Sequence, residues 1–209
     1  MKNYFLILFL ILSNACSTNA SKAPQKGVAK SAEHVSPVLP GFKSPNPTVL
    51  DMNGKEVKLH AVLKRQKTVL VFYRGGWCPY CNRHLQRLRK IEGKLKGLGF
   101  QIVALSSDSP TKFQESLKRH KLKFTLLSDS LVNAAKEFGL AFKVDDKTNM
   151  KYLSFGINLT KAAGTDHHIL PVPAVYLIDK GLLIHYMYAN PNYKIRLNDS
   201  VLLQAAKAI

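Results

Sequence analysis

The fold is decided by residues 68–81, TVLVFYRGGWCPYC. Their first six residues form a continuous β-branched and aromatic run, which is typical of a central strand covered on both faces. Four apolar residues follow at three- and four-residue spacing, and this predicts an amphipathic helix: Leu85, Leu88, Ile91 and Leu95. The pair Cys78 and Cys81 therefore falls at the junction of a buried strand and a helix.

Strands and helices alternate along the rest of the chain. The expected strands are 100–105, 124–127, 175–178 and 183–186, and the last two form a hairpin. Three further helices are expected. One begins at Ser109-Pro110, and the other two cover 132–138 and 197–209. Ahead of them, Asn53-Gly54 predicts a hairpin between 48–50 and 57–59. This order predicts an α/β domain over residues 48–209, with a central mixed sheet flanked by helices.

One part of this domain lacks clear periodicity. Residues 143–168 predict an insertion over one end of the sheet, before the strand that carries Pro173.

The first 20 residues predict export as a signal peptide. Lys2 precedes the apolar run 4–12, which is too short to span a bilayer comfortably, and small polar residues follow. Cleavage after Ala15 would leave Cys16 first, which resembles a bacterial lipoprotein signal and implies lipidation of Cys16. Cleavage after Ala20 would instead release a soluble protein. Both alternatives place the domain in the periplasm, tethered to the membrane in the first case.

Residues 21–47 are rich in Pro, Gly, Lys and Ser and have few large apolar groups. Because such a composition buries little surface, we expect a flexible tether.

Composition restricts the classes of function. The chain has 209 residues, of which 46% are hydrophobic, and its net charge is +18, which favours anionic surroundings. The basic stretches 64–67 and 118–123 raise the alternative of nucleic acid, but no stacking motif or recognition helix accompanies them. We expect no nucleic-acid partner. Three cysteines exclude a disulfide-stapled miniprotein and a four-cysteine zinc site.

The chemistry is expected at Cys78 and Cys81. Unpaired amides in the first turn of a helix stabilise a thiolate, so the pKa falls below its usual value of ~8.5. Two intervening residues allow a reversible disulfide across one turn. A zinc site would need two more ligands besides the cysteines. The candidates His167 and His168 are adjacent in the sequence, and adjacent histidines usually point apart. We therefore expect no metal and no cofactor.

Four motifs occur in order and carry a family resemblance: 72–81, Ser128-Asp129, 170–179 and 190–193. The chain from about Thr48 to Ile209 resembles the peroxiredoxin-like branch of the alkyl hydroperoxide reductase/thiol-specific antioxidant family. The resemblance implies a thioredoxin-like fold and either thiol peroxidase or thiol–disulfide exchange activity.

The spacing of the active-site loop is similar to that of peroxiredoxins. These carry a Pro, a Thr four residues later and the peroxidatic Cys three further, which correspond to Arg74, Cys78 and Cys81. The resemblance thus places Cys81 as the peroxidatic residue and Cys78 in place of the Thr. A thioredoxin loop is one residue shorter, so the loop length favours the peroxidase.

The strand opposite is similar to thioredoxins instead. Peroxiredoxins carry an Arg where this chain has Pro173, and Val172-Pro173 resembles the cis-proline that faces Cys-x-x-Cys in thioredoxins. Arg74 is then either the replacement for the missing cation, polarising the peroxide, or a solvated loop charge.

The neighbouring residues have weaker assignments. Trp77 is expected to shield the site, and Tyr80 to be exposed where a partner could contact it, beside Pro79. For Asp108 and Asp129 a cap or turn role is expected. The histidines His84 and His120 have basic neighbours and are expected at the surface.

The favoured activity is reduction of hydrogen peroxide or organic hydroperoxides by the dithiol, which a thioredoxin-type protein regenerates. Cys81 attacks the peroxide and Cys78 then closes the disulfide. The alternative is an oxidoreductase that acts on periplasmic protein disulfides through Cys78. A non-catalytic adaptor is disfavoured, because it has no need of an acidic dithiol.

Overall fold

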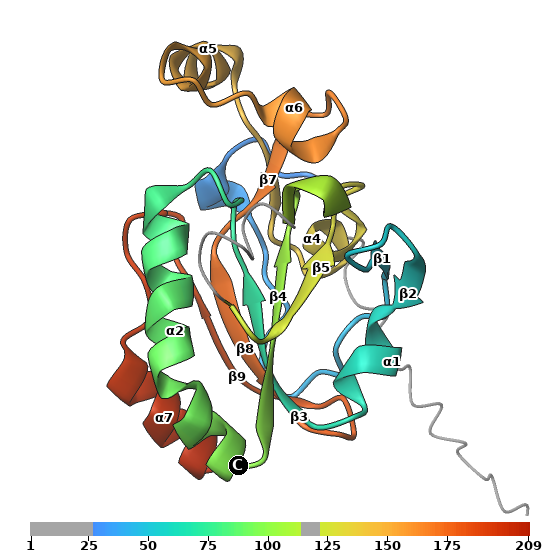
Figure 1. The fold of residues 1–209 in the computed structure, drawn as a ribbon, viewed down its shortest axis with the longest axis vertical. Helices are drawn as coiled ribbons and strands as arrows, with labels where there is room; N and C mark the ends of the chain where they lie inside the picture. Colours follow the sequence, from blue (N-terminus) through green and yellow to red (C-terminus); the bar gives the residue numbers. More distant parts are fainter. Residues whose placement is uncertain (1–26, 114–121) are drawn as a thin grey trace, which may run out of the picture.

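The structure is a computed structural model that describes residues 27–113 and 122–209. Its centre is a seven-stranded mixed sheet with the strand order β2-β1-β5-β4-β3-β8-β9 (Figure 1). The strands are β1 (Thr48–Leu50), β2 (Glu56–Lys58), β3 (Lys67–Phe72), β4 (Phe100–Ser106), β5 (Thr125–Ser128), β8 (Ala174–Ile178) and β9 (Ile184–Ala189). Strands β3, β4 and β5 run parallel, whereas β8 is antiparallel to β3. The expected α/β fold with a mixed sheet is confirmed.

Helices cover both faces of the sheet. On one face lie α2 (Pro79–Gly97) and α7 (Asp199–Lys207), side by side in Figure 1. The other face meets α1 (Leu59–Leu63) and α4 (Asn133–Glu137). The side chains of β3 point alternately into two hydrophobic cores, one on each face of the sheet. Val69 and Val71 lie in the core beneath α2 (the α2 core), and Leu70 and Phe72 lie in the core beneath α1 and α4 (the α4 core). This two-sided burial explains the continuous apolar run in the sequence.

The two expected hairpins are present. Strands β1 and β2 pair antiparallel around the Asn53-Gly54 turn, and β8 pairs antiparallel with β9. Of the helix expected after Ser109, residues 110–113 are helical, and the remainder through Leu117 lies outside the described residues. No helix within the described ranges is long and apolar enough to cross a membrane.

The insertion is confirmed at one end of the sheet, and it has more regular structure than its sequence suggests. It contains α5 (Asp146–Ser154) and α6 (Leu159–Ala163), and two strands flank it, β6 (Ala141–Lys143) and β7 (Ile169–Pro171). Strands β6 and β7 form a separate antiparallel ladder. Asp145 and Asn158 cap α5 and α6 by accepting from backbone amides. Figure 1 shows α5 projecting beyond the end of the main sheet.

The expected tether is wrong for its described part, residues 27–47. Ala29 exchanges backbone hydrogen bonds with β6: its N–H donates to Ala141 and its carbonyl accepts from Lys143, both at 2.9 Å. A 3-10 helix, η1 (Ala32–His34), follows, and Val38 is buried against the core of α4. Backbone pairing and one buried valine therefore hold this segment against the domain. Residues 21–26 and the expected signal peptide lie outside the described residues.

Candidate functional site

The Cys-x-x-Cys segment is shaped by a glycine turn under the first turn of α2. Gly75 has φ +152°, and an added Cβ would lie 2.2 Å from the Trp77 Nε1. The amide of Gly76 donates to the Asp108 carboxylate at 2.6 Å. Cys78 is the N-cap residue of α2, and Pro79 begins the helix with its fixed φ. This turn places both sulfurs at the helix N-terminus, as the sequence predicts.

The two thiols are buried and coupled. Cys78 is 1% exposed and Cys81 is not exposed, and both are free. A hydrogen bond from the Cys81 thiol, aided by the charges of Arg74 and Arg196, lowers the pKa of Cys78 to about 6 despite its burial. Burial, together with Cys78, raises the pKa of Cys81 above its usual value. The resting negative charge of the pair is therefore favoured on Cys78.

Arg196 is a site residue that the sequence did not reveal. Its Nη2 donates to the Cys81 Sγ at 3.5 Å, and its Nη1 donates to the backbone carbonyls of Tyr193 and Ile195. The next residues are anchored from α2, because Arg87 donates to Asp199 at 2.8 Å and to the Leu197 carbonyl at 2.6 Å. No local pattern around Arg196 marks it, since its partner is distant in sequence.

Arg74 lies at the site and is not a solvated loop charge. Its side chain is buried, with a residue exposure of 3%. Three aromatic rings surround the guanidinium, with centroids 5.0 Å (Trp77), 5.2 Å (Tyr152) and 4.1 Å (Tyr193) from its Cζ. Its Nη2 also donates to the Tyr152 hydroxyl. Of these contacts, sequence reasoning found Trp77 and missed Tyr152 on the insertion.

Pro173 lies beside this group. Phe72 pairs with Ala174, so Pro173 borders the point where the active-site loop leaves β3. Pro173 and Arg74 line one open pocket together with Tyr152 and Tyr193. The described residues contain no cis peptide bond, so the expected cis bond between Val172 and Pro173 is wrong. Val172 itself is fully buried in the α4 core, where its side chain is held by packing.

The remaining residues near the dithiol have defined contacts. Trp77 packs on Tyr152, with ring centroids 5.8 Å apart. Tyr80, which is partly buried against the α2 core, packs edge-on against Tyr193 at 5.7 Å. Asp108 supports the loop through Gly76, and its burial raises the pKa of its carboxyl to about 7. The Asp108 carboxylate thus holds the distant active-site loop, and the local cap or turn role expected for it is wrong.

His84 was expected at the surface, and this is wrong. It is buried on α2, where desolvation and the nearby Arg196 and Arg87 charges lower its pKa to about 3. The helical period of α2 predicts this burial, since His84 lies on the same face as the buried Cys81 and Leu88. His120 lies outside the described residues.

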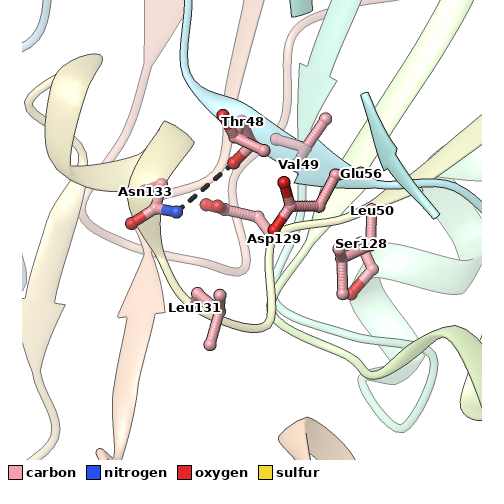
Figure 2. Close-up of a pocket in the computed structure, with 8 residues that line it drawn as sticks. All are labelled: Thr48, Val49, Leu50, Glu56, Ser128, Asp129, Leu131 and Asn133. Atoms are coloured by element: carbon pink, nitrogen blue, oxygen red, sulfur yellow. Dashed lines mark hydrogen bonds between the residues drawn. The ribbon is translucent and has the colours of Figure 1, made fainter. Parts of the chain in front are cut away.

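A second pocket lies at the edge of the sheet, between β1 and the start of α4 (Figure 2). Asp129 accepts from the amides of Ala134 and Ala135 at 2.8 and 2.7 Å, which confirms its cap role. The Asn133 side chain donates to the Thr48 carbonyl in the same place. These contacts join α4 to the sheet.

The two neighbouring histidines of the insertion do not share a ligand position. His167 contacts the Ser130 carbonyl at 2.8 Å, whereas His168 contacts the Thr160 hydroxyl at 3.0 Å. Within residues 27–113 and 122–209 there is no group of three His, Cys, Asp or Glu side chains placed to hold a metal ion.

Comparison with known proteins gives consistent results. The sequence pattern of the AhpC/TSA family matches residues 39–187. Peroxiredoxin Q of Oryza sativa subsp. japonica, a chloroplastic protein, is 29% identical over 153 residues, which are 73% of this chain and 60% of that protein. The putative peroxiredoxin bcp of Haemophilus influenzae is 30% identical over 106 residues, which are 51% of this chain and 68% of that protein. The match thus spans less than two thirds of the rice relative.

Solved structures show the same fold. Reduced Prx3 from Vibrio vulnificus superposes with a TM-score of 0.67, at 16% identity, over 81% of this chain and 99% of that chain. Peroxidoxin BcpB from Mycobacterium tuberculosis superposes with a TM-score of 0.62, at 17% identity, over 81% and 97%.

Proposed function

Because this chain belongs to the AhpC/TSA family, in its peroxiredoxin branch, we propose that it is a thiol-dependent peroxidase. Its substrates are hydrogen peroxide or organic hydroperoxides, and a thioredoxin-type dithiol protein regenerates it. The observation that carries the proposal is the buried pair Cys78 and Cys81, one helical turn apart, with the Arg74 and Arg196 charges acting on it. Cations beside a thiolate stabilise the negative charge that such a reaction requires.

The two thiols have complementary roles in the proposed reaction. A proton passes from the Cys81 thiol to the Cys78 thiolate, and the charge then lies on Cys81, where Arg196 donates at 3.5 Å. The Cys81 sulfur attacks the terminal peroxide oxygen, so that an S–O bond forms and the O–O bond breaks. Cys78 gives its proton to the departing oxygen, which leaves as water or an alcohol.

The cycle closes within the same helical turn. Cys81 is now a sulfenic acid and Cys78 a thiolate, which attacks the Cys81 sulfur and expels hydroxide. The hydroxide takes a proton from solvent, and a disulfide joins the two residues. The external dithiol supplies two electrons and two protons to restore both thiols. No metal or cofactor takes part in these steps.

Stopped-flow mixing of the reduced protein with hydrogen peroxide tests the proposal. We expect Cys78→Ser to retain a sulfenic acid that dimedone traps, and Cys81→Ser to lose rapid peroxide consumption. Trapping on Cys78 in the Cys81→Ser protein would reverse the two roles. In the wild type, peptide mass mapping should place a two-hydrogen loss on the pair after peroxide treatment, and tightly bound zinc in the reduced protein would contradict the assignment.

A second candidate is a thiol–disulfide oxidoreductase that acts on protein disulfides. The lowered pKa of Cys78, at the first position of the motif, favours it, because a thiolate there can attack a substrate disulfide. If the wild type reacts with peroxide no faster than a free thiol, but reduces insulin disulfides through Cys78, this second function replaces the first.

We also propose that the chain is exported to the periplasm. The basic and apolar start of the sequence supports this, and Cys16 offers a lipid attachment point if cleavage follows Ala15.

A further inference from the structure

One side chain of the insertion contacts residues next to the Cys78 and Cys81 thiols. Helix α5 buries none of its residues fully, and its Met150 and Leu153 are 70% and 48% exposed. Tyr152 of the same helix is half-buried, and its hydroxyl accepts a hydrogen bond from the Arg74 Nη2. Its ring also lies 5.2 Å from the Arg74 Cζ and packs on Trp77. Tyr152 thus connects an otherwise exposed helix to the cation beside the thiols.

Arg74 needs such contacts, because its charge is buried and forms no ion pair with a carboxylate of residues 27–113 or 122–209. None of the ion pairs found in the described part of the chain includes Arg74. Its Nε is buried and has no hydrogen-bond acceptor among the residues that the structure describes. A buried charge without a counter-ion is costly, and aromatic faces and a hydroxyl offset part of that cost. The positive charge of Arg74 stabilises the Cys78 thiolate.

We propose that Tyr152 is a positioning residue for the dithiol: its hydroxyl and ring hold the Arg74 guanidinium beside Cys78 and thereby set the reactivity of that thiol. The proposal rests on the dithiol chemistry proposed above. It gives the insertion a role in the reaction, since the seating of α5 determines where a cation of the active-site loop lies.

Other groups also act on Cys78 and must be held constant in a test. Its thiolate faces Cys81 from α2, Arg74 from the active-site loop and Arg196 from the segment before α7. Asp108 acts one step further away, through its electrostatic coupling with Cys81. A change at Tyr152 leaves all of these residues in the protein.

The test is the pH profile of Cys78 alkylation by iodoacetamide in the reduced full-length protein, read by peptide mass mapping. Tyr152→Phe removes the hydroxyl and keeps the ring, whereas Tyr152→Ala removes both. At pH 5 we expect alkylation to slow by about threefold in the first variant and about tenfold in the second, because at a pH well below the pKa of Cys78 one pKa unit changes the thiolate fraction about tenfold. Above pH 9 the three proteins should converge, since Cys78 is then ionised in each.

Leu153→Ala is the matched control, because it truncates the neighbouring exposed residue on the same helix. It should leave the Cys78 profile unchanged. An unchanged profile in Tyr152→Ala, with the thermal melting curve preserved, would overturn the proposal. The proposed peroxidase is tested separately: if Tyr152→Ala shifts the profile but the wild type consumes no peroxide, the positioning role stands and the peroxidase function fails.

Discussion

The Arg196 Nη2 donates to the Cys81 Sγ at 3.5 Å, although 115 residues separate the two in sequence. The same guanidinium lowers the pKa of Cys78 through its charge. One cation from the segment before α7 therefore acts on both sulfurs of the pair. In the proposed reaction it stabilises the negative charge at Cys81 while that sulfur attacks the peroxide.

Replacing Arg196 with Gln should slow peroxide reduction. Loss of the charge raises the pKa of both thiols, so we expect about a tenfold lower rate constant at pH 7, as one pKa unit would give. Stopped-flow measurement with hydrogen peroxide checks this. The rate constant of Arg196→Lys should lie between those of the wild type and Arg196→Gln. The control is Arg65→Gln, because Arg65 is exposed and its side chain donates to the Ala61 carbonyl of α1. Equal rates in Arg196→Gln and wild type would show that the guanidinium has no part in the reaction.

Gly75→Ala should destabilise the fold. The added Cβ would lie 2.2 Å from the Trp77 Nε1 and 2.6 Å from the Asp108 Oδ1, at a φ of +152° that favours glycine. We expect the free energy of unfolding to fall by about 2–4 kcal/mol. Chemical denaturation with urea measures it.

Gly93→Ala is the control for this substitution. Gly93 lies inside α2, and an added Cβ there meets nothing within 4 Å. It should raise the free energy of unfolding by up to about 1 kcal/mol, because alanine favours a helix over glycine. A Gly75→Ala protein as stable as the wild type would contradict the close approach of Trp77 and Asp108 to the glycine.

His84 should make the protein less stable in mild acid. Burial lowers the pKa of His84 to about 3, below its ordinary value of ~6.5. Between these values the unfolded chain binds a proton that the folded chain does not, so the free energy of unfolding falls as the pH falls. From pH 7.5 to 5 we expect the wild type to lose about 2 kcal/mol more than His84→Gln does. Urea denaturation at the two pH values measures this, and His34→Gln, which changes an exposed histidine, should behave like the wild type.

The intact mass of the protein isolated from membranes and from the periplasm tests the export proposal. A mature chain that begins at Cys16 with added acyl mass would show lipidation, and a start at Ser21 would show the soluble form. A chain that retains Met1 would contradict both forms of processing.

The parts of the fold that depend on neighbouring residues could be predicted from the amino-acid sequence. The β3 run, the Cys-x-x-Cys at the start of α2 and the Asn53-Gly54 hairpin follow from period, capping and turn chemistry. These signals act between residues that are close in the sequence, so they can be recognised without the structure. His84 was also readable in principle from the buried stripe of α2, had the helical period been applied to it.

The surroundings of the two thiols could not be predicted in this way, because they come from segments that are distant in the sequence. Tyr152 reaches Arg74 across 78 residues and Arg196 reaches Cys81 across 115. Residues 27–47 lie against the domain because Ala29 pairs with β6 and Val38 is buried in the core beside α4. Each of these contacts depends on the order of strands in the sheet and on the seating of the insertion. Burial then sets the energy of every charge at the site, and burial is a property of the folded chain and not of any short stretch of it.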